Sequence, residues 1–167
     1  MRLVICPLHE VQNGLSLWRP SHVVTLASPG AEQAQIPAGP ARLSLIFNDI
    51  AEPQPGLQAP AAEDVARLMA FARDWPRAQP MMIQCWAGVS RSPAAAYIVA
   101  CMLSAPGTEA RLARTLRAAA PFATPNPRLV ALADQLLNRR GAMVDAIAGI
   151  GRGAETSLGQ TFALELA

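Results

Sequence analysis

The chain has 167 residues, enough for one domain that buries a sizeable hydrophobic core. Its 51% hydrophobic and 16% charged residues indicate a folded globular protein rather than a disordered one. A formal net charge of +2 is too small to favour nucleic acid or a membrane surface as a partner. The longest apolar stretch, Ala94–Leu103, has roughly half of the ~20 residues that a transmembrane helix needs.

The three cysteines, Cys6, Cys85 and Cys101, are widely spaced and odd in number. This pattern indicates neither a disulfide framework nor a zinc site. The apolar run near Met1 is too short for a secretory signal, so we expect a reducing, cytoplasmic location. We predict no metal and no cofactor. Every basic residue is arginine, so an anion site must use arginine or backbone N–H groups.

Four short apolar runs, bounded by Pro, Gly or Asn, predict buried strands. They are Arg2–Cys6, His22–Leu26, Arg42–Phe47 and Met81–Cys85. Helical spacing of apolar residues predicts helices around 65–72, 94–104, 112–119 and 129–137. Strands that alternate with helices predict an α/β fold: a single domain with a central, mostly parallel sheet of four to five strands, flanked by helices.

The helix boundaries carry their own signals. Thr108 is a plausible N-cap, and Asn126 followed by Pro127 is typical of a helix start. We expect one domain over residues 1–167, in which 141–167 form a helical tail of unassigned role. The glycine cluster at 149–153 predicts a turn, because no strand precedes it as a nucleotide-binding loop would require.

The chemistry is concentrated in the segment 84–92, which joins a predicted strand to a predicted helix. A loop at a helix N-terminus presents unpaired N–H groups and the positive end of the helix dipole. Such a loop can curl so that its amides converge on one anion, and Gly88 permits backbone angles that other residues resist. The predicted phosphate-binding residues are Trp86, Ala87, Gly88, Val89, Ser90 and Arg91.

Two residues of this segment suit a nucleophilic mechanism. Arg91 can place two donors on phosphate oxygens, and the same positive field stabilises a thiolate at Cys85. A thiolate beneath a bound phosphate is placed for in-line attack, which gives a cysteinyl-phosphate intermediate. Cys-x5-Arg alone is a weak pattern; Gly88, Ser92 and the strand–loop–helix context make it specific. The alternative is a buried structural cysteine before a helix, with an exposed arginine.

The segment resembles the signature loop of protein tyrosine phosphatases, His-Cys-x5-Arg-Ser/Thr, and is closest to the dual-specificity-like branch. Two further stretches are similar to that branch. Residues 43–49 resemble the strand that ends in the general-acid aspartate, and residues 117–126 resemble the segment after the catalytic helix, with Pro121, Pro125 and Asn126 in order. The resemblance covers residues 1–140 and implies that the signature loop lies between a strand and a helix.

The resemblance implies roles for several residues. Asp49 would protonate the leaving group, with Glu52 as the second candidate, although an ordinary turn residue is the alternative. Ser92 would help the Cys85 thiolate to leave, or would simply be a first-turn serine. Asn126 is first an N-cap, and its support of the loop is implied by the resemblance alone. Trp86 either walls the pocket or packs against its surroundings.

The chain departs from the family pattern in three places. Gln84 replaces the usual histidine before the cysteine, Ala120 stands where arginine is common, and residues 141–167 have no counterpart. Gln84 ends a buried strand, so its amide needs a polar partner. We expect the amide of Gln84 to support the loop through its donors and acceptor, without a titratable charge.

The resemblance implies a phosphatase for phosphotyrosine or phosphoserine/threonine in proteins. A small non-protein ester, such as a phosphoinositide, a nucleotide or an RNA 5′ end, is an alternative substrate. The uncharged loop positions speak against a highly anionic one, because phosphoinositide-type relatives often carry lysine there. A phosphate-binding module without catalysis and a rhodanese-like sulfurtransferase are rival functions; neither needs Ser92 or Asp49.

Overall fold

The computed structural model describes residues 1–166. One five-stranded sheet runs through these residues in the order β3-β2-β4-β1-β5. Its strands are β1 (Arg2–Pro7), β2 (His22–Ala27), β3 (Ala41–Ile46), β4 (Met81–Cys85) and β5 (Phe162–Glu165). β1 to β4 are parallel, and β5 runs antiparallel to β1 at the edge. The predicted α/β class and mostly parallel sheet are therefore confirmed, because all four predicted strands are present.

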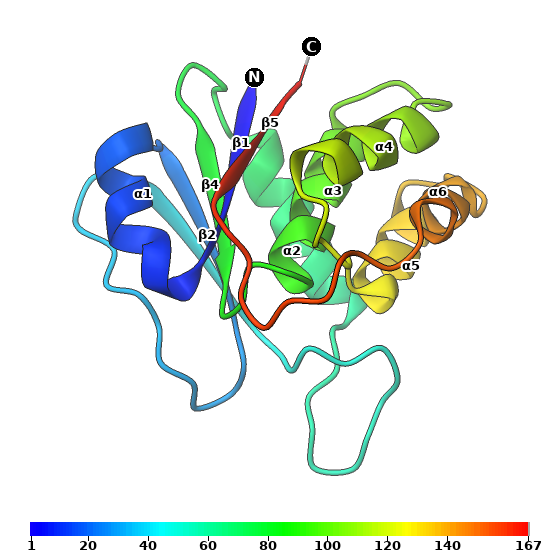
Figure 1. Ribbon diagram of the computed structural model, residues 1–167, viewed down its shortest axis with the longest axis horizontal. Helices are drawn as coiled ribbons and strands as arrows, with labels where there is room; N and C mark the ends of the chain where they lie inside the picture. The colour runs from blue at the N-terminus through cyan, green and yellow to red at the C-terminus, as the bar shows by residue number, and fades with distance from the viewer. Residues whose placement is uncertain (167) are drawn as a thin grey trace.

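The helices form two unequal layers on the sheet (Figure 1). A 3-10 turn (Leu8–Glu10) and α1 (Val11–Trp18) cover one face. The other face is covered by α2 (Ala62–Arg73), α3 (Arg91–Met102), α4 (Glu109–Ala119), α5 (Pro127–Leu136) and α6 (Ala142–Ile150). Helix α1 was not predicted, although Val11, Leu15 and Trp18 follow helical spacing.

The period-two alternation of the strands builds both layers. In β1, Leu3 and Ile5 join the large core under α2 to α6, whereas Val4 and Cys6 pack with α1. Both faces of β1, β2 and β4 are covered, and these strands are buried on both sides, as is typical of parallel sheets. The edge strand β3 is largely exposed.

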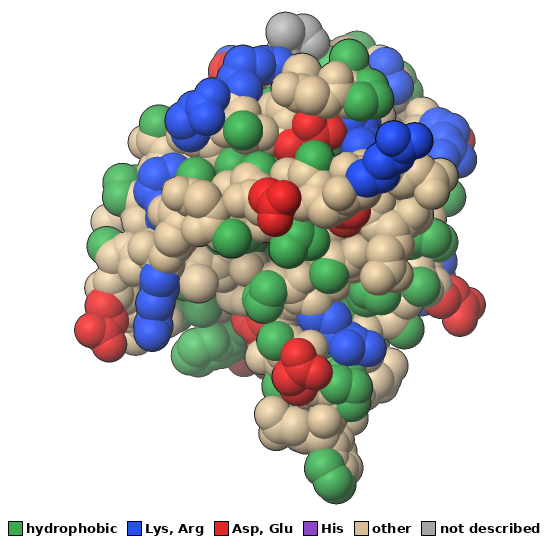
Figure 2. Space-filling model, turned by 90° about the vertical axis from the view of Figure 1, so that its right-hand side faces the viewer, with side chains coloured by type: hydrophobic (Ala, Val, Ile, Leu, Met, Phe, Trp, Pro, Cys, Tyr) green, Lys and Arg blue, Asp and Glu red, His purple; other side chains and the backbone are tan. Residues whose placement is uncertain are grey.

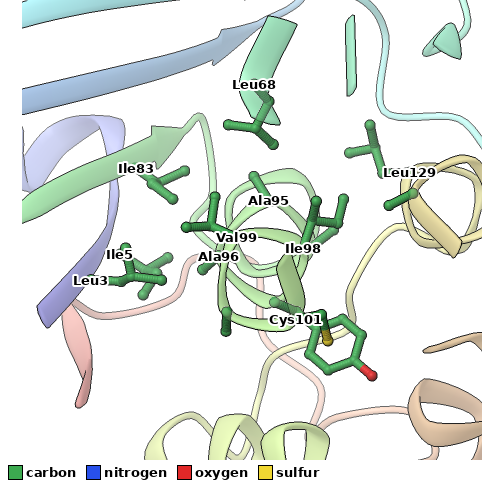
Figure 3. Close-up of a cluster of buried hydrophobic side chains, with 14 of the residues drawn as sticks. Leu3, Ile5, Leu68, Ile83, Ala95, Ala96, Ile98, Val99, Cys101 and Leu129 are labelled. Atoms are coloured by element: carbon green, nitrogen blue, oxygen red, sulfur yellow. The ribbon is translucent and has the colours of Figure 1, made fainter. Parts of the chain in front are cut away.

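Helix α3 lies at the centre of the large core (Figure 3). Ala95 and Val99 lie among side chains of the sheet and of the neighbouring helices, and every residue from Arg91 to Cys101 is buried. A helix that is apolar on all sides must be enclosed on all sides. This enclosure fixes the N-terminus of α3 relative to the end of β4, which immediately precedes it.

The tail differs from the expectation of a helical segment. Helix α6 is present, but Phe162–Glu165 forms β5 and pairs with β1 from Ile5 to Arg2. The terminal N–H₃⁺ of Met1 also donates to the Leu166 carbonyl, at 2.9 Å. An edge strand this short has no periodicity that separates it from a helix, so pairing with β1 decides its structure.

Two predicted helix starts have different outcomes. Asn126 caps α5 as predicted, because its side-chain oxygen accepts from the Leu129 N–H at 3.1 Å. Thr108 precedes α4, but its hydroxyl donates to the Ala105 carbonyl at 2.7 Å and does not cap the helix. The backbone of Thr108 is helical rather than extended, which turns the hydroxyl away from the first-turn N–H groups.

The surface carries mixed charge. On the face shown in Figure 2, acidic and basic side chains lie interspersed over the described residues. None of the helices within residues 1–166 is long and apolar enough to cross a membrane.

Candidate active site

Cys85 lies at the carboxyl end of β4, the central strand, between β2 and β1. Ligands of open α/β sheets bind beyond the carboxyl ends of such strands. Residues 86–90 then form the signature loop, and Arg91 and Ser92 begin α3. The loop therefore faces the N-terminus of a twelve-residue helix, whose dipole favours an anion.

Gly88 is required in this loop for two reasons. Its φ of +70° lies in the left-handed region that glycine adopts without strain. A Cβ at this position would also lie 2.9 Å from the backbone nitrogen of Pro7, too close for any side chain. The end of β1 thus packs directly against the loop and fixes its height above the sheet.

The carbonyl groups of the loop are held outward. Each of four accepts a hydrogen bond from a backbone N–H outside the loop. The pairs are Leu8 N to Trp86 O at 3.1 Å, Gly159 N to Ala87 O at 2.8 Å, Thr124 N to Val89 O at 2.8 Å and Asn126 N to Ser90 O at 3.3 Å. In a trans peptide the C=O and the following N–H point in opposite directions.

The N–H groups of the loop consequently point inward. Within residues 1–166, none of the N–H groups of residues 87–90 donates a hydrogen bond to the protein. Neighbouring N–H groups that the protein leaves unpaired are suited to an anion.

The guanidinium of Arg91 is buried across the loop, with its side chain 6% exposed. Its Nη1 donates to the Phe47 carbonyl at 3.0 Å and to Ser28 Oγ at 3.1 Å. Its Nε is buried and has no hydrogen-bond partner in the described residues. The carboxylate of Asp49 is the nearest counter-charge, 3.7 Å from that nitrogen. The side chain is oriented by two acceptors and keeps a donor free for a ligand.

The thiol of Cys85 is 2% exposed and lies 3.1 Å from the Ser92 hydroxyl. Ser92 is itself fully buried, so this hydroxyl is held against the sulfur. The neighbouring thiol of Cys6 is different, because burial, then Cys85 and then Glu10 raise the pKa of Cys6 to about 12. A thiol with so high a pKa stays protonated near neutral pH, so Cys6 does not offer a thiolate there.

Asp49 follows β3 and reaches the signature loop. Its Oδ1 accepts from the Ser90 hydroxyl and from the Asn126 side-chain amide, each at 2.8 Å. The side chain is one-third exposed, which leaves it open to an incoming group. Glu52, the second candidate, makes no hydrogen bond or ion pair with the signature loop in the described part of the chain.

Asn126 joins three segments. Its Nδ2 donates to Asp49 and, at 3.3 Å, to the Ile50 carbonyl, its N–H donates to Ser90, and its Oδ1 caps α5. The residue is 2% exposed. One asparagine therefore links the loop that carries Asp49 to the signature loop and to a helix, so that their separation is fixed.

Gln84 is 2% exposed, and its Nε2 donates to the Thr25 hydroxyl at 2.9 Å. Thr25 lies opposite Gln84 in the β2–β4 register. The expected polar partner thus exists, but it belongs to the neighbouring strand rather than to the loop. Gln84 supports the strand end from which the loop starts.

Two adjoining hollows flank the loop on the α1 side. One of about 270 Å³ is lined partly by Thr25, Gln84 and Arg91. The second, of about 760 Å³, extends toward α1, and Trp86 lines both. Trp86 is 60% exposed, so it walls these hollows and does not pack into the interior. Cys85 lines neither hollow.

The structure adds residues that the sequence did not indicate. Ser28 and Thr25 are the partners of Arg91 and Gln84, and Gly159 of the tail contacts the loop. Serine, threonine and glycine in turns and strands are too common to signal such roles. Only the strand register and the return of the tail bring them to the site.

No protein-family model matches the chain, and no curated protein matches it in sequence. Solved structures do match. The crystal structure of DUSP15 superposes with a TM-score of 0.59 at 15% identity, covering 91% of this chain and 92% of that one. The crystal structure of PTPMT1 in complex with PI(5)P gives a TM-score of 0.55 at 16% identity, covering 87% and 88%. The chain therefore has the dual-specificity phosphatase fold that its signature segment implied.

Proposed function

We propose that the chain is a cysteine-dependent phosphatase that hydrolyses phosphate monoesters. The observation that carries the proposal is the loop itself. Four of its carbonyls accept hydrogen bonds from outside the loop, the N–H groups of residues 87–90 have no partner within residues 1–166, and the thiol of Cys85 lies at its start. Arg91 adds a cation to the same site, and its buried Nε has no hydrogen-bond partner among the described residues. A structural cysteine would not need such an arrangement.

In the proposed mechanism the Cys85 thiolate attacks phosphorus as the ester P–O bond breaks. The loop N–H groups and Arg91 stabilise the charge on the phosphate oxygens, and Asp49 gives its proton to the leaving oxygen. Water then attacks the cysteinyl-phosphate and transfers a proton to Asp49, which releases phosphate. The Ser92 hydroxyl donates to the departing thiolate, for which its 3.1 Å distance from the sulfur is suitable.

Asp49 must carry a proton when substrate is bound. Its Oδ2 lies 3.7 Å from Arg91 Nε, the nitrogen that has no hydrogen-bond partner in the described residues. A phosphate dianion would compete with the carboxylate for that donor. Asn126 keeps the carboxyl group within reach of the loop.

We propose that the substrate is a phosphorylated protein with a single phosphate at the site. The charged residues that line the two hollows are Glu32, Arg91 and, when protonated, His9. A substrate with several phosphates would meet one carboxylate there and no second arginine. PTPMT1 was crystallised with PI(5)P, so a phosphoinositide is the alternative that the substrate panel must include. Three free thiols fit a reducing, cytoplasmic setting.

The first test is turnover of p-nitrophenyl phosphate by the wild-type chain and by Cys85→Ser. We expect wild-type turnover and a loss of at least ~10³-fold in the variant. The variant should still bind tungstate, because the loop N–H groups and Arg91 remain. Residual turnover after repurification would contradict Cys85 as the nucleophile, and tungstate binding without wild-type turnover would favour a phosphate-binding module.

The second test compares substrates at equal concentration. The panel contains a phosphotyrosine peptide, a phosphoserine peptide, a phosphoinositide and a nucleoside monophosphate. We expect kcat/KM to be highest for one of the two peptides. A higher value for the phosphoinositide would contradict the protein substrate while leaving the phosphatase chemistry intact. Thiosulfate with cyanide, which tests for sulfur transfer, should give no thiocyanate.

A further inference from the structure

The C-terminal tail reaches the signature loop. After α6, residues 151–161 run past the segment before α5 and return to the sheet edge as β5, as the orange-to-red trace in Figure 1 shows. The Ala154 N–H donates to the Pro121 carbonyl at 2.9 Å, and the Gly153 N–H donates to Thr124 Oγ1 at 3.1 Å. Arg117 Nη2 holds the Gly151 carbonyl at 2.7 Å. These bonds anchor the tail on one side of the loop.

The other side is anchored at the start of β5. The Thr161 N–H donates to Glu10 Oε2 at 2.8 Å, and its hydroxyl donates to the same oxygen. Pairing with β1 begins one residue later, at Phe162 opposite Ile5. Residues 155–160 thus connect two hydrogen-bonded anchors, and Gly159 lies near the second anchor, at Thr161.

Gly159 touches the loop directly. Its N–H donates to the Ala87 carbonyl at 2.8 Å. A Cβ at Gly159 would lie 3.2 Å from the carbonyl oxygens of both Ala87 and Gly88, and 2.6 Å from Cε2 of Phe122. Its φ is not among the positive values, so the glycine is needed for close approach rather than for its backbone angle.

We propose that Gly159 is a positioning residue that aims the Gly88 N–H at the bound phosphate. The carbonyl of Ala87 and the N–H of Gly88 belong to one planar trans peptide and point in opposite directions. A hydrogen bond that holds the carbonyl toward the tail therefore holds the N–H toward the site. The inference rests on the proposed function, because it assumes that the loop binds a phosphate group.

The test uses a pair of variants that separates the loop from Phe122. In Phe122→Ala the ring that a new Cβ would strike is absent, whereas the contacts of Gly159→Ala with the two loop carbonyl oxygens remain. We compare Phe122→Ala with Phe122→Ala/Gly159→Ala, well below the unfolding temperature of each. The readouts are kcat and KM for p-nitrophenyl phosphate, and Kd for tungstate by isothermal titration calorimetry.

We expect the double variant to bind tungstate about tenfold more weakly than Phe122→Ala, as for one lost charge-assisted hydrogen bond. Its kcat should fall roughly tenfold to a hundredfold. Gly149→Ala is the matched control: it lies in the same tail with nothing within 4 Å of its Cβ, so both values should stay at wild type. A purely structural glycine would lower the unfolding temperature and leave Kd unchanged.

Equal tungstate Kd in the two Phe122 variants would overturn the inference, whatever the turnover. The proposed function fails separately, through a wild-type chain that binds tungstate but hydrolyses nothing. In that case a tenfold change in Kd would still support Gly159 as a positioning residue for the anion. A wild-type chain that binds no tungstate would overturn both.

Discussion

A buried arginine, a cysteine and a carboxylate lie at each end of α3, but the hydrogen bonds of the arginine differ between the two ends. At the C-terminal end, Arg139 bonds Glu109 Oε1 at 2.7 Å and also donates to the Cys101 and Ser104 carbonyls. At the N-terminal end, Arg91 Nε lies 3.7 Å from Asp49 and, within residues 1–166, has no hydrogen-bond partner. The first arginine satisfies helix carbonyls, as a cation at a helix C-terminus should.

The same residue types are therefore structural at one end of the helix and suited to chemistry at the other. No buried nitrogen of Arg139 lacks a hydrogen-bond partner in the described residues, so its burial stabilises the fold and leaves nothing for a ligand. Where donors are oriented but unpaired, the fold carries a cost that a bound anion would relieve. The cysteines follow the same division, because burial raises the pKa of Cys101 to about 12, whereas Cys85 faces the Ser92 hydroxyl and the start of a helix.

The largest expected effect is the contrast between the thiols in alkylation by iodoacetamide at pH 7. A pKa near 12, raised from 9.0, lowers the thiolate fraction of Cys101 by about 10³-fold relative to an ordinary thiol, and Cys6 is equivalent. Peptide mapping should therefore find label on Cys85 alone, and vanadate should prevent it. Equal labelling of Cys101 in the native protein would contradict this difference between the cysteines at the two ends of α3.

The two carboxylates should separate activity from stability. Asp49→Asn should lower kcat roughly 10²-fold or more for an alkyl phosphate, and less for p-nitrophenyl phosphate, whose leaving group needs less protonation. Glu109→Gln should leave kcat unchanged and cost about 3 kcal/mol of stability, because it unpairs buried Arg139. Kinetics and urea unfolding measure both. Glu52→Gln is the control, and a kcat loss in it rather than in Asp49→Asn would identify the other carboxylate as the acid.

Asn126→Asp tests the hydrogen bonds that Asn126 makes near the N-terminal end of α3, where the candidate site lies. Aspartate keeps the oxygen that caps α5 but removes the Nδ2 donor and places a negative charge beside Asp49. We expect about tenfold lower kcat together with a lower unfolding temperature, because the new carboxylate is buried beside another. Asn126→Ala, which adds no charge, should lose the cap and cost about 1 kcal/mol of stability. If Asn126→Asp retained wild-type kcat, the asparagine would be a cap and nothing else.

The smallest expected effect is on stability at high pH, and it arises from Cys101 at the C-terminal end of α3. The unfolded chain loses the Cys101 proton near 9.0, whereas the folded chain keeps it until about 12. Between these values the folded state binds more protons, so stability falls as pH rises, by at most about 1.4 kcal/mol per pH unit for this thiol. Cys101→Ala should remove that part of the slope, as urea unfolding between pH 8 and about 11 would measure. An unchanged slope would contradict the raised pKa.

The sequence predicted the centre of the fold better than its edges. The four parallel strands and the helices around α3 follow from apolar periodicity, because both faces of that sheet are covered. Strand β5 could not be predicted, since four residues at an edge take their structure from the partner strand. Helix α1 was missed although its spacing was visible; Gly14, at its middle, permits the approach to Met82 that packs it on the sheet.

The residues of the candidate site also fall into those that the sequence predicted and those that it could not. Cys85, Gly88, Arg91 and Ser92 stand in one short segment where β4 leads into α3, so their spacing and its strand–loop–helix context predicted them. Asp49 and Asn126 were found through resemblance, and a hydrogen bond joins them across 77 positions of the chain. Thr25, Ser28 and Gly159 carried no signal, because their contacts depend on strand register and on the path of the tail.

The most direct test of the account is to trap the covalent intermediate. The wild-type chain is mixed with a phosphotyrosine peptide, quenched by denaturation within its first turnover and analysed by mass spectrometry. We expect one added phosphoryl group on the peptide that contains Cys85, and none in Cys85→Ser or on the peptides of Cys6 and Cys101. Turnover with no phosphoryl group on Cys85, or with one on another residue, would contradict it.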